Sequence, residues 1–509
     1  METKTAAIEM RNITKRFGPV LANDKVWLNI YRGEILALLG ENGSGKTTLM
    51  NMLSGIYFPD EGEIKIDGKE VVIRSPKDAF DNGIGMIHQH FKLVDVLTAA
   101  ENIVLGLPGK LDLKAASAKI REICDKYGFS VDPTQKIYDM SVSQKQTVEI
   151  VKVLYRGADI LILDEPTAVL TPQETDKLFA VLCNMRNDGK AIVIITHKMH
   201  EVEALSDRVA ILRHGQFIGD MLTKDTNAQE MTNMMVGHAV SLNIERPDPV
   251  DPKPRVEVKG LTVRSVDGII KLDDVSFTAN SGEILGIAGI SGCGQKELLE
   301  AIAGLQTVES GSISYIEDDG SREELIGKDP LSIAELGVSL SFVPEDRLGM
   351  GLVGNMNLAD NMMLRSFRRG KSIFTDRRSP RALAEAVVQE LSVSTPSVDT
   401  PVRRLSGGNV QKVLVGREIA SAPTVLLTAY AVRGLDIHSS YTIYDLINRQ
   451  KKAGVAVIFV GEDLDVLLEL CDRILVLCGG KVSGIVPGRG AEKREVGMMM
   501  TKLGGQSHE

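Results

Sequence analysis

Short apolar runs rich in Ile, Val and Leu alternate with longer stretches of helical periodicity along the first half of the chain. Three such runs are Ile160–Leu163, Ala191–Ile195 and Val209–Leu212. Runs this short and this apolar are typical of strands buried on both faces, and their alternation with helices indicates βαβ units. The pattern therefore predicts an α/β fold with a largely parallel sheet.

The same plan occurs twice in the chain. The segment Gly33–Gly40, GEILALLG, recurs as Gly282–Gly289, GEILGIAG, and each is an apolar run that ends at a glycine-rich loop. Asp207 and Asp472 each precede an arginine and a further apolar run, at an offset of 472 − 207 = 265 positions. A repeat of this length fixes the number of domains before any motif is interpreted. We therefore expect two α/β domains.

Prolines mark the seam between the two halves. Residues 245–254 read ERPDPVDPKP. Prolines cannot continue a helix and favour an extended, semi-rigid connection. We expect a first domain over residues 1–245, a proline-rich linker over 246–255 and a second domain over 256–509.

The composition excludes several classes of protein. The net charge of −9 leaves no basic surplus for a nucleic-acid backbone, so we expect no nucleic-acid partner. The longest apolar runs, such as Val455–Val460, are far shorter than the roughly 18 residues of a membrane-spanning helix. The five cysteines have no CxxC spacing, which argues against a disulfide framework or a zinc site. Any transport function would therefore depend on partner chains in the membrane.

A phosphate-binding loop follows the first apolar run. The segment Gly40–Thr47 reads GENGSGKT and precedes the helix-like Thr48–Leu53. Its glycines allow backbone N–H groups to surround phosphate oxygens, its lysine reaches the terminal phosphates, and its hydroxyl can bind Mg²⁺. The nucleotide-binding residues expected here are Gly40, Asn42, Gly43, Ser44, Gly45, Lys46, Thr47 and Thr48.

Two adjacent carboxylates, Asp164 and Glu165, end the apolar run Ile160–Leu163. Taken alone, paired acids at the end of a strand can be a solvated turn. Beside a phosphate-binding loop, the first acid can hold Mg²⁺ through water and the second can act as general base toward the attacking water. The pair therefore predicts hydrolysis of a nucleoside triphosphate.

The chain resembles the ATP-binding-cassette (ABC) ATPases over nearly its whole length, twice. The most specific motif is Leu405–Asn409, LSGGN, which matches the family's signature. The resemblance implies ATP and Mg²⁺ as cofactors. It also implies that each half has a RecA-like parallel-sheet core, an antiparallel β subdomain and a helical subdomain.

The resemblance assigns roles to further residues. Phe17 matches the aromatic that stacks on adenine, and Gln89 matches the residue that links Mg²⁺ to the transport partner. His197 matches the histidine that contacts the γ-phosphate. The signature residues expected to complete the ATP site are Ser406, Gly407 and Gly408.

The second half lacks most of these groups. Glutamine stands at the position of the loop lysine, lysine at that of the hydroxyl, alanine and tyrosine at the carboxylate pair, and glutamate at that of His197. The residues concerned are Gln295, Lys296, Ala429, Tyr430 and Glu462.

The first half in turn has an altered signature, with Ser143 where the family has glycine. In this family each ATP lies between the loop of one cassette and the signature of the other. The intact loop would then face the intact signature, which predicts one catalytic and one degenerate composite site.

The double length, the altered second loop and Val343–Arg347, VPEDR, look like the bacterial importer ATPases for simple sugars and nucleosides. The segment Ile84–Phe91, IGMIHQHF, is closer to the nucleoside branch. This resemblance implies a peripheral subunit on the cytoplasmic face of the cell membrane, bound to integral membrane permease subunits and acting indirectly with an extracytoplasmic solute-binding protein.

Two other functions are considered. A soluble tandem cassette protein that acts as an ATP-driven switch on the ribosome would normally carry two intact sites and a long charged helical linker. The short proline-rich seam argues against it. A regulatory nucleotide-binding module without turnover is disfavoured by the presence of Glu165 and His197.

Overall fold

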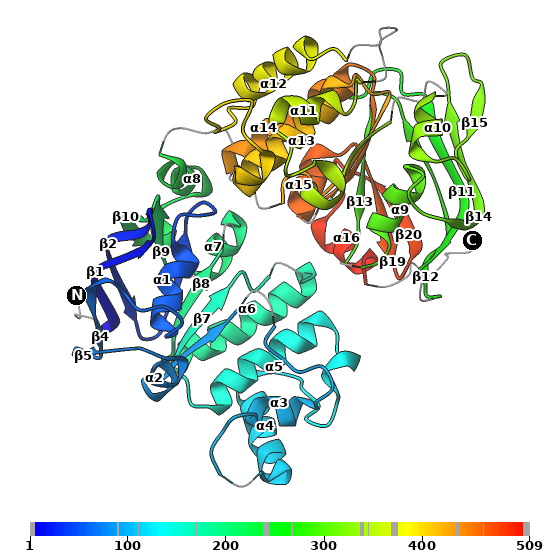
Figure 1. Ribbon diagram of the computed structural model, residues 1–509. Helices are drawn as coiled ribbons and strands as arrows, with labels where there is room; N and C mark the ends of the chain where they lie inside the picture. Colours follow the sequence, from blue (N-terminus) through cyan, green and yellow to red (C-terminus); the bar gives the residue numbers. More distant parts are fainter. Residues whose placement is uncertain are drawn as a thin grey trace. The chain divides into compact units, whose positions relative to one another are not determined.

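The computed structural model describes residues 6–88, 91–109, 111–167, 170–196, 198–237, 244–265, 268–290, 292–335, 340–344, 346–367, 375–433, 435, 437–461 and 463–501. The chain divides into two compact units, Met1–Ser241 and Leu242–Glu509 (Figure 1). Each unit is an α/β assembly built on two sheets.

The centre of the first unit is a six-stranded sheet with the order β10-β9-β3-β8-β7-β6. β3 pairs in parallel with β8 and β9, β7 pairs in parallel with β6 and β8, and β10 runs antiparallel to β9. Every residue of β3, β7 and β8 is buried, which confirms the prediction from their apolar runs. The strands are β3 (Glu34–Leu39), β6 (Ile84–Ile87), β7 (Ile160–Asp164), β8 (Ala191–Ile195), β9 (Arg208–Arg213) and β10 (Gln216–Leu222).

A second, antiparallel sheet has the order β2-β1-β4-β5. Helix α1 packs between the two sheets, because its apolar residues share one core cluster with strands of both. Helices α5 and α6 cover the opposite face of the central sheet. The antiparallel strands are β1 (Ala6–Phe17), β2 (Val20–Tyr31), β4 (Glu61–Ile66) and β5 (Lys69–Val71).

A separate helical part of the first unit is formed where α3, α4 and α5 share a small core of their own. Together with the two sheets it gives the three parts that were predicted for each half. The helices are α1 (Lys46–Leu53), α2 (Pro76–Asp81), α3 (Ala99–Val104), α4 (Leu113–Tyr127), α5 (Val142–Tyr155), α6 (Pro172–Asn187), α7 (Met199–Leu205) and α8 (Ala228–Val236).

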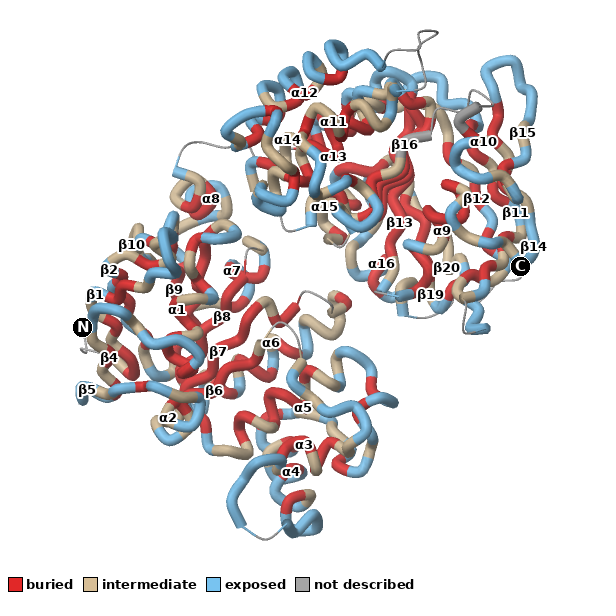
Figure 2. The backbone as a smooth tube through the Cα atoms, viewed as in Figure 1, coloured by how far each residue is buried: buried red, intermediate tan, exposed pale blue. Residues whose placement is uncertain are grey.

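The second unit repeats this plan. Its central sheet has the order β16-β17-β18-β13-β19-β20, and its antiparallel sheet has the order β12-β11-β14-β15. When the first unit's central sheet is written from its other edge, β6-β7-β8-β3-β9-β10, each strand has its counterpart ten numbers later at the same place. Figure 2 shows the central strands as the most continuously buried segments. The strands are β11 (Pro254–Arg264), β12 (Ile270–Asn280), β13 (Ile284–Ala288), β14 (Val308–Ile316), β15 (Arg322–Glu324), β16 (Leu340–Val343), β17 (Val425–Ala429), β18 (Ala456–Val460), β19 (Arg473–Cys478) and β20 (Lys481–Pro487).

Helices cover both faces of this sheet as in the first unit, with α9 on the side of the antiparallel sheet and α13, α14 and α15 on the other. The helices are α9 (Gln295–Ile302), α10 (Pro330–Glu335), α11 (Leu358–Met363), α12 (Arg378–Glu390), α13 (Gly407–Ala420), α14 (Ile437–Lys452), α15 (Leu464–Leu470) and α16 (Lys493–Met499).

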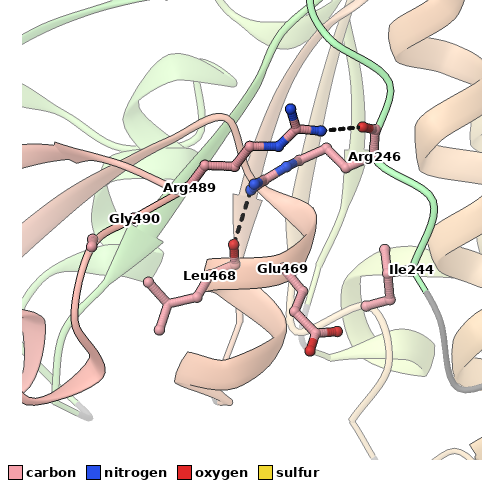
Figure 3. Close-up of a pocket in the computed structure, with 8 residues that line it drawn as sticks. Ile244, Arg246, Leu468, Glu469, Arg489 and Gly490 are labelled. Carbon is pink, nitrogen blue, oxygen red and sulfur yellow. Dashed lines mark hydrogen bonds between the residues drawn. The ribbon is translucent and has the colours of Figure 1, made fainter.

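Residues 244–253, which we call the strap, lie along the surface of the second unit. The Asn448 side chain donates to the Glu245 carbonyl (2.6 Å), and the Arg246 guanidinium donates to the Leu468 carbonyl (2.9 Å). Arg489 donates to the Arg246 carbonyl (2.9 Å), so that the two arginines lie side by side (Figure 3). The strap leads directly into β11. The limits of the predicted linker and of the two domains stay predictions.

The strap also changes the surroundings of an ion pair that both units contain. Lys451 Nζ lies 2.7 Å from Asp472 and also donates to the Pro247 carbonyl of the strap. The side chains of Lys451 and Asp472 are only 1% and 11% exposed. The equivalent pair in the first unit, Arg186–Asp207 (3.1 Å), is 28% and 40% exposed. Burial by the strap therefore makes the second pair far more sensitive to loss of its cation.

Replacement of the buried cation tests this difference. Lys451→Met leaves the Asp472 carboxylate and the Pro247 carbonyl without their cation and should destabilise the second unit by about 3–5 kcal/mol. Arg186→Met, the matched control, should cost the first unit no more than about 1 kcal/mol. Hydrogen exchange of the β13 and β3 amides reports the two units separately. Equal losses of protection would mean that the strap does not bury a stabilising contact.

Candidate functional site

The first phosphate-binding loop lies between β3 and α1, and its lysine is held inside it. Lys46 is buried, and its Nζ donates to the carbonyls of Gly40 (2.7 Å) and Glu41 (3.0 Å). Burial lowers the pKa of Lys46, whereas the charges of Glu165 and Asp164 act in the opposite direction. The loop therefore holds a poorly solvated ammonium, to which an anionic ligand would be attracted.

The curvature of the loop requires glycine. Gly45 has φ +95°, and a Cβ at that position would lie 2.4 Å from the Ala22 carbonyl oxygen. The buried Asn23 donates to the Gly45 carbonyl (3.3 Å) and thus supports the loop from β2. The buried Ser44 hydroxyl has no hydrogen-bond partner among the described residues. A phosphate oxygen fits this site, because it would accept a hydrogen bond that the loop itself leaves unmade.

The strand order brings a hydroxyl and a carboxylate together. Thr47 Oγ1 lies 3.4 Å from Asp164 Oδ2, at the start of α1 and the end of β7. Burial, helped by the charge of Glu165, raises the pKa of Asp164 to about 6. Mg²⁺ prefers such hard oxygen ligands and usually combines one or two protein groups with phosphate oxygens and water. Thr47 and Asp164 therefore fit a divalent cation. Its positive charge would offset the repulsion between the carboxylates of Asp164 and Glu165.

Glu165 has an unusual backbone conformation. Its φ is +47°, in the left-handed region, and its N–H donates to the Ile195 carbonyl of β8 (2.9 Å). A non-glycine residue held in this region costs about 1–3 kcal/mol and is often found where a side chain must be presented in one direction. Tyr430 of the second unit has the same geometry, with φ +54° and an N–H bond to Val460 (3.0 Å). The backbone is thus preserved where the carboxylate is not.

The second loop likewise keeps its shape without its charge. Gln295 Nε2 donates to the Gly289 carbonyl (2.8 Å) and so replaces the bond from Lys46 to Gly40. Gly294 has φ +104°, close to that of Gly45. The position of Asn23 is occupied by Leu272, at the loop offset of 289 − 40 = 249. The loop of the second unit is therefore closed by a neutral amide.

Two aromatic rings of the first unit lie against each other. Phe17, the last residue of β1, is 41% exposed, and its ring centre lies 5.1 Å from that of Tyr57 in an edge-to-face arrangement. An exposed ring can stack on a base with about 1–3 kcal/mol. Tyr57 was not identified from the sequence, because no motif contains it.

The two signature segments differ at the start of the helix that follows each. Ser406 caps α13, and Gly407 and Gly408 form its first turn without side chains that could cover the N–H groups. In the first unit Ser141 caps α5 as part of a capping box with Gln144. The next residue, Val142, is 40% exposed. The start of α13 therefore leaves its first-turn N–H groups more open to an anion than the start of α5 does.

The structure brings together most of the predicted residues of the first site. Gln89, His197 and Glu462 lie outside the described residues. Asn23 and Tyr57 are additional, and only spatial contacts identify them. The predicted residues that form or adjoin the first loop are Gly40, Asn42, Gly43, Ser44, Gly45, Lys46, Thr47, Thr48, Asp164 and Glu165. Phe17 lies at the end of β1, against Tyr57.

Comparison with known proteins agrees with these motifs. The sequence model of the family described as "ABC transporter" matches residues 23–168 and 272–428. The chain is 42% identical to the nucleoside import ATP-binding protein NupA of Lactococcus lactis subsp. cremoris, covering 99% of each protein. It is 40% identical to the glucose import ATP-binding protein TsgD13 of Haloferax volcanii (98% of this chain, 96% of the relative). It is also 40% identical to the guanosine import ATP-binding protein NupO of Bacillus subtilis (97% of each).

The two loops together suggest a test of Lys46. Lys46→Gln and Lys46→Met both remove the charge, but glutamine can keep the bond to Gly40, as Gln295 does in the second unit. We expect both variants to bind a nucleoside triphosphate about 10–100-fold more weakly, since a hydrogen bond to a charged group contributes about 1.5–3 kcal/mol. Both variants also lose the positive charge that compensates Asp164 and Glu165, and the free energy of unfolding of Lys46→Met should be lower than that of Lys46→Gln by about 1–3 kcal/mol, because methionine cannot make the bond to Gly40. Calorimetric titration and thermal unfolding measure both; identical unfolding of the two variants would contradict the loop-closing bond.

Proposed function

Because the chain belongs to the ABC transporter family, we propose that it is the ATP-hydrolysing subunit that energises an importer of nucleosides or simple sugars. Members of this family hydrolyse ATP, so the chain is an ATPase. The relatives named as nucleoside, guanosine and glucose import ATP-binding proteins align with this chain over nearly their whole length. These names support the solute classes.

We further propose that only one of the two ATP sites hydrolyses. The observation that carries this is the contrast between two loops of the same backbone geometry. The first combines a buried lysine with a nearby carboxylate pair; the second has a glutamine, an alanine and a tyrosine at these places. In the proposed composite site, ATP on the first loop is completed by the signature residues Ser406–Gly408 when the two halves close on it.

The proposed chemistry uses groups of the first unit. Lys46 and the loop N–H groups hold the phosphates, and Glu165 accepts a proton from the attacking water. Thr47 and Asp164 would hold Mg²⁺, which supplies positive charge against the phosphate oxygens. Gln89 and His197 keep their predicted roles of linking the metal to the transport partner and of contacting the γ-phosphate.

Four variants in the assembled complex test the one-site proposal. Glu165→Gln should slow steady-state ATP hydrolysis by about 10²–10⁴-fold while ATP still binds. Replacement of Tyr430 by Phe should change turnover less than a few-fold, because no base is lost there. Gly408→Asp should be severe, because it places a negative charge beside the γ-phosphate of the working site, whereas Ser143→Asp should be mild. Comparable losses from these last two variants would mean that both sites hydrolyse.

We also propose that the segment 92–140 receives the permease. This segment carries exposed apolar side chains before α3, between α3 and α4, at the first residue of α4 and after α4. Exposed apolar side chains are a common feature of protein contact surfaces. No helix within the described residues is long and apolar enough to cross a membrane. The exposed side chains are Val94, Val96, Leu105, Leu107, Leu111, Leu113 and Tyr138.

In this proposal the chain is bound peripherally at the cytoplasmic face of the membrane through integral membrane permease subunits, and an extracytoplasmic solute-binding protein acts with it indirectly. The ribosomal alternative receives no support. The relatives named above are importer subunits, and the connection 244–253 is packed as an extended strap rather than as a long charged helix. No nucleic-acid partner is proposed.

Crosslinking tests the proposed permease surface. A cysteine at Val96, which is 65% exposed, should crosslink to a permease loop in the membrane complex, with a yield that changes when ATP is added. A cysteine at Val250 of the strap, 86% exposed, is the control and should give little crosslinked product. Crosslinks from position 250 alone would show that the docking surface has been placed wrongly.

A further inference from the structure

A buried carboxylate joins the ends of two central strands in the first unit. Glu201 of α7 is only 4% exposed. Its Oε1 accepts a hydrogen bond from the Thr167 hydroxyl (2.5 Å), and its Oε2 accepts one from the Thr196 hydroxyl (3.3 Å). Lys198 Nζ lies 3.1 Å from Glu201 Oε1. The carboxylate is thus paired on both oxygens, as a buried charge requires.

These contacts surround the residue proposed as general base. Thr167 is two positions after Glu165, and Thr196 directly follows Ile195, whose carbonyl accepts the Glu165 N–H. Lys198 Nζ also donates to the Thr167 carbonyl (3.3 Å). The short segment 165–167 is therefore attached to the end of β8 at both of its ends. The Glu165 N–H bonds directly to Ile195, and Thr167 is linked to Thr196 through the Glu201 carboxylate.

A further bond reaches the same segment from α5. The Gln146 side chain donates to the Pro166 carbonyl, the residue between Glu165 and Thr167. Its counterpart at the offset of 265, Gln411, is 1% exposed and has no hydrogen-bond partner in the described part of the chain. The polar amide persists in the second unit although its bond has been lost.

The second unit has lost the remaining partners together. At the same offset, Thr167, Thr196 and Glu201 become Val432, Gly461 and Val466. Both valines pack against the apolar core. The sheet order and the bond from Tyr430 to Val460 are nevertheless kept. The fold therefore does not need the network, and the network is absent where the general base is absent.

We propose that Glu201 is a positioning residue for ATP hydrolysis, which fixes the segment 165–167 against the end of β8 so that the Glu165 carboxylate is held in one orientation. This inference rests on the proposed function of the first site. A displacement of about 1 Å at a reacting group can lower a rate about 100-fold, so loss of this support should reduce turnover far more than ATP binding.

A purely structural role for Glu201 makes a different prediction. Glu201→Val alone leaves the buried hydroxyls of Thr167 and Thr196 without their acceptor and Lys198 without its carboxylate partner, so it should lower both the unfolding temperature and kcat. Thr167→Val/Glu201→Val reproduces the pair found in the second unit and removes the main unpaired hydroxyl. Thermal stability should then recover toward the wild-type value, whereas kcat should stay about 10–100-fold low.

Two single variants complete the set. Glu201→Gln can still accept from Thr167 and donate to Thr196, and should keep kcat within about threefold of wild type. Glu203→Gln, on the exposed side of the same helix, is the matched control and should not change kcat. The KM for ATP should change by less than about threefold in all four variants, since the phosphate-binding groups are untouched.

The measurements are the ATPase kcat and KM of the full chain in its complex, with thermal unfolding of the same samples. Recovery of kcat together with stability in Thr167→Val/Glu201→Val would overturn the inference. A rise in the KM for ATP with unchanged kcat in Glu201→Val would overturn it as well. Glu165→Gln is measured in parallel. If Glu165→Gln keeps full activity, the proposed site itself fails; if it loses activity and the double variant does not, only the role of Glu201 fails.

Discussion

The parallel pairing of the central strands is the constraint on which both loops depend. β3, β8 and β7 are neighbours, so their carboxyl ends meet at one edge of the sheet, where ligands bind in open α/β folds. This edge brings Lys46, Thr47 and Asp164 together although they are far apart in the sequence. Backbone hydrogen bonds hold the strands and the left-handed residue at the end of β7 and β17. The second unit could therefore lose both carboxylates and still keep the left-handed residue at Tyr430, while the Gln295 amide keeps its loop closed.

Charge balance explains why the losses in the second unit occur together. In the first unit one buried ammonium faces two carboxylates, and burial lowers the pKa of Lys46 while it raises that of Asp164. Removing only the lysine would leave two uncompensated acids, and removing only the acids would leave a buried cation, both of which are costly. The second unit has a glutamine and no carboxylates at these places, and its displaced Lys296 is half exposed, 3.7 Å from Glu300. Replacing the lysine and both carboxylates together by uncharged side chains leaves no uncompensated buried charge.

Most features that could be predicted from the sequence are local motifs. The phosphate-binding loop, the carboxylate pair and the parallel sheet were recognisable because each is a contiguous stretch with a fixed chemistry or periodicity. Asn23, Tyr57 and Glu201 were not recognised, because their roles arise from contacts between segments that are distant along the chain. The proline content of the strap indicated a stiff, extended chain, but composition cannot show that it lies on the second unit. The roles of Gln89 and His197 stay predictions.

The two units have come to differ in how they use buried polar groups. In the first unit the Glu201 carboxylate is surrounded by two hydroxyls and an ammonium. Stability falls if any of these buried polar groups loses its partner. The second has Val432 and Val466 at these positions, and well-packed apolar groups of similar size are often as stable as a buried polar set or more so. In the second unit the strap also lies on the Lys451–Asp472 pair, which is more buried than its counterpart Arg186–Asp207. The hydrogen-bonded network around Glu201 is thus found in the unit that carries the proposed general base, whereas the second unit has apolar side chains at two of the equivalent positions.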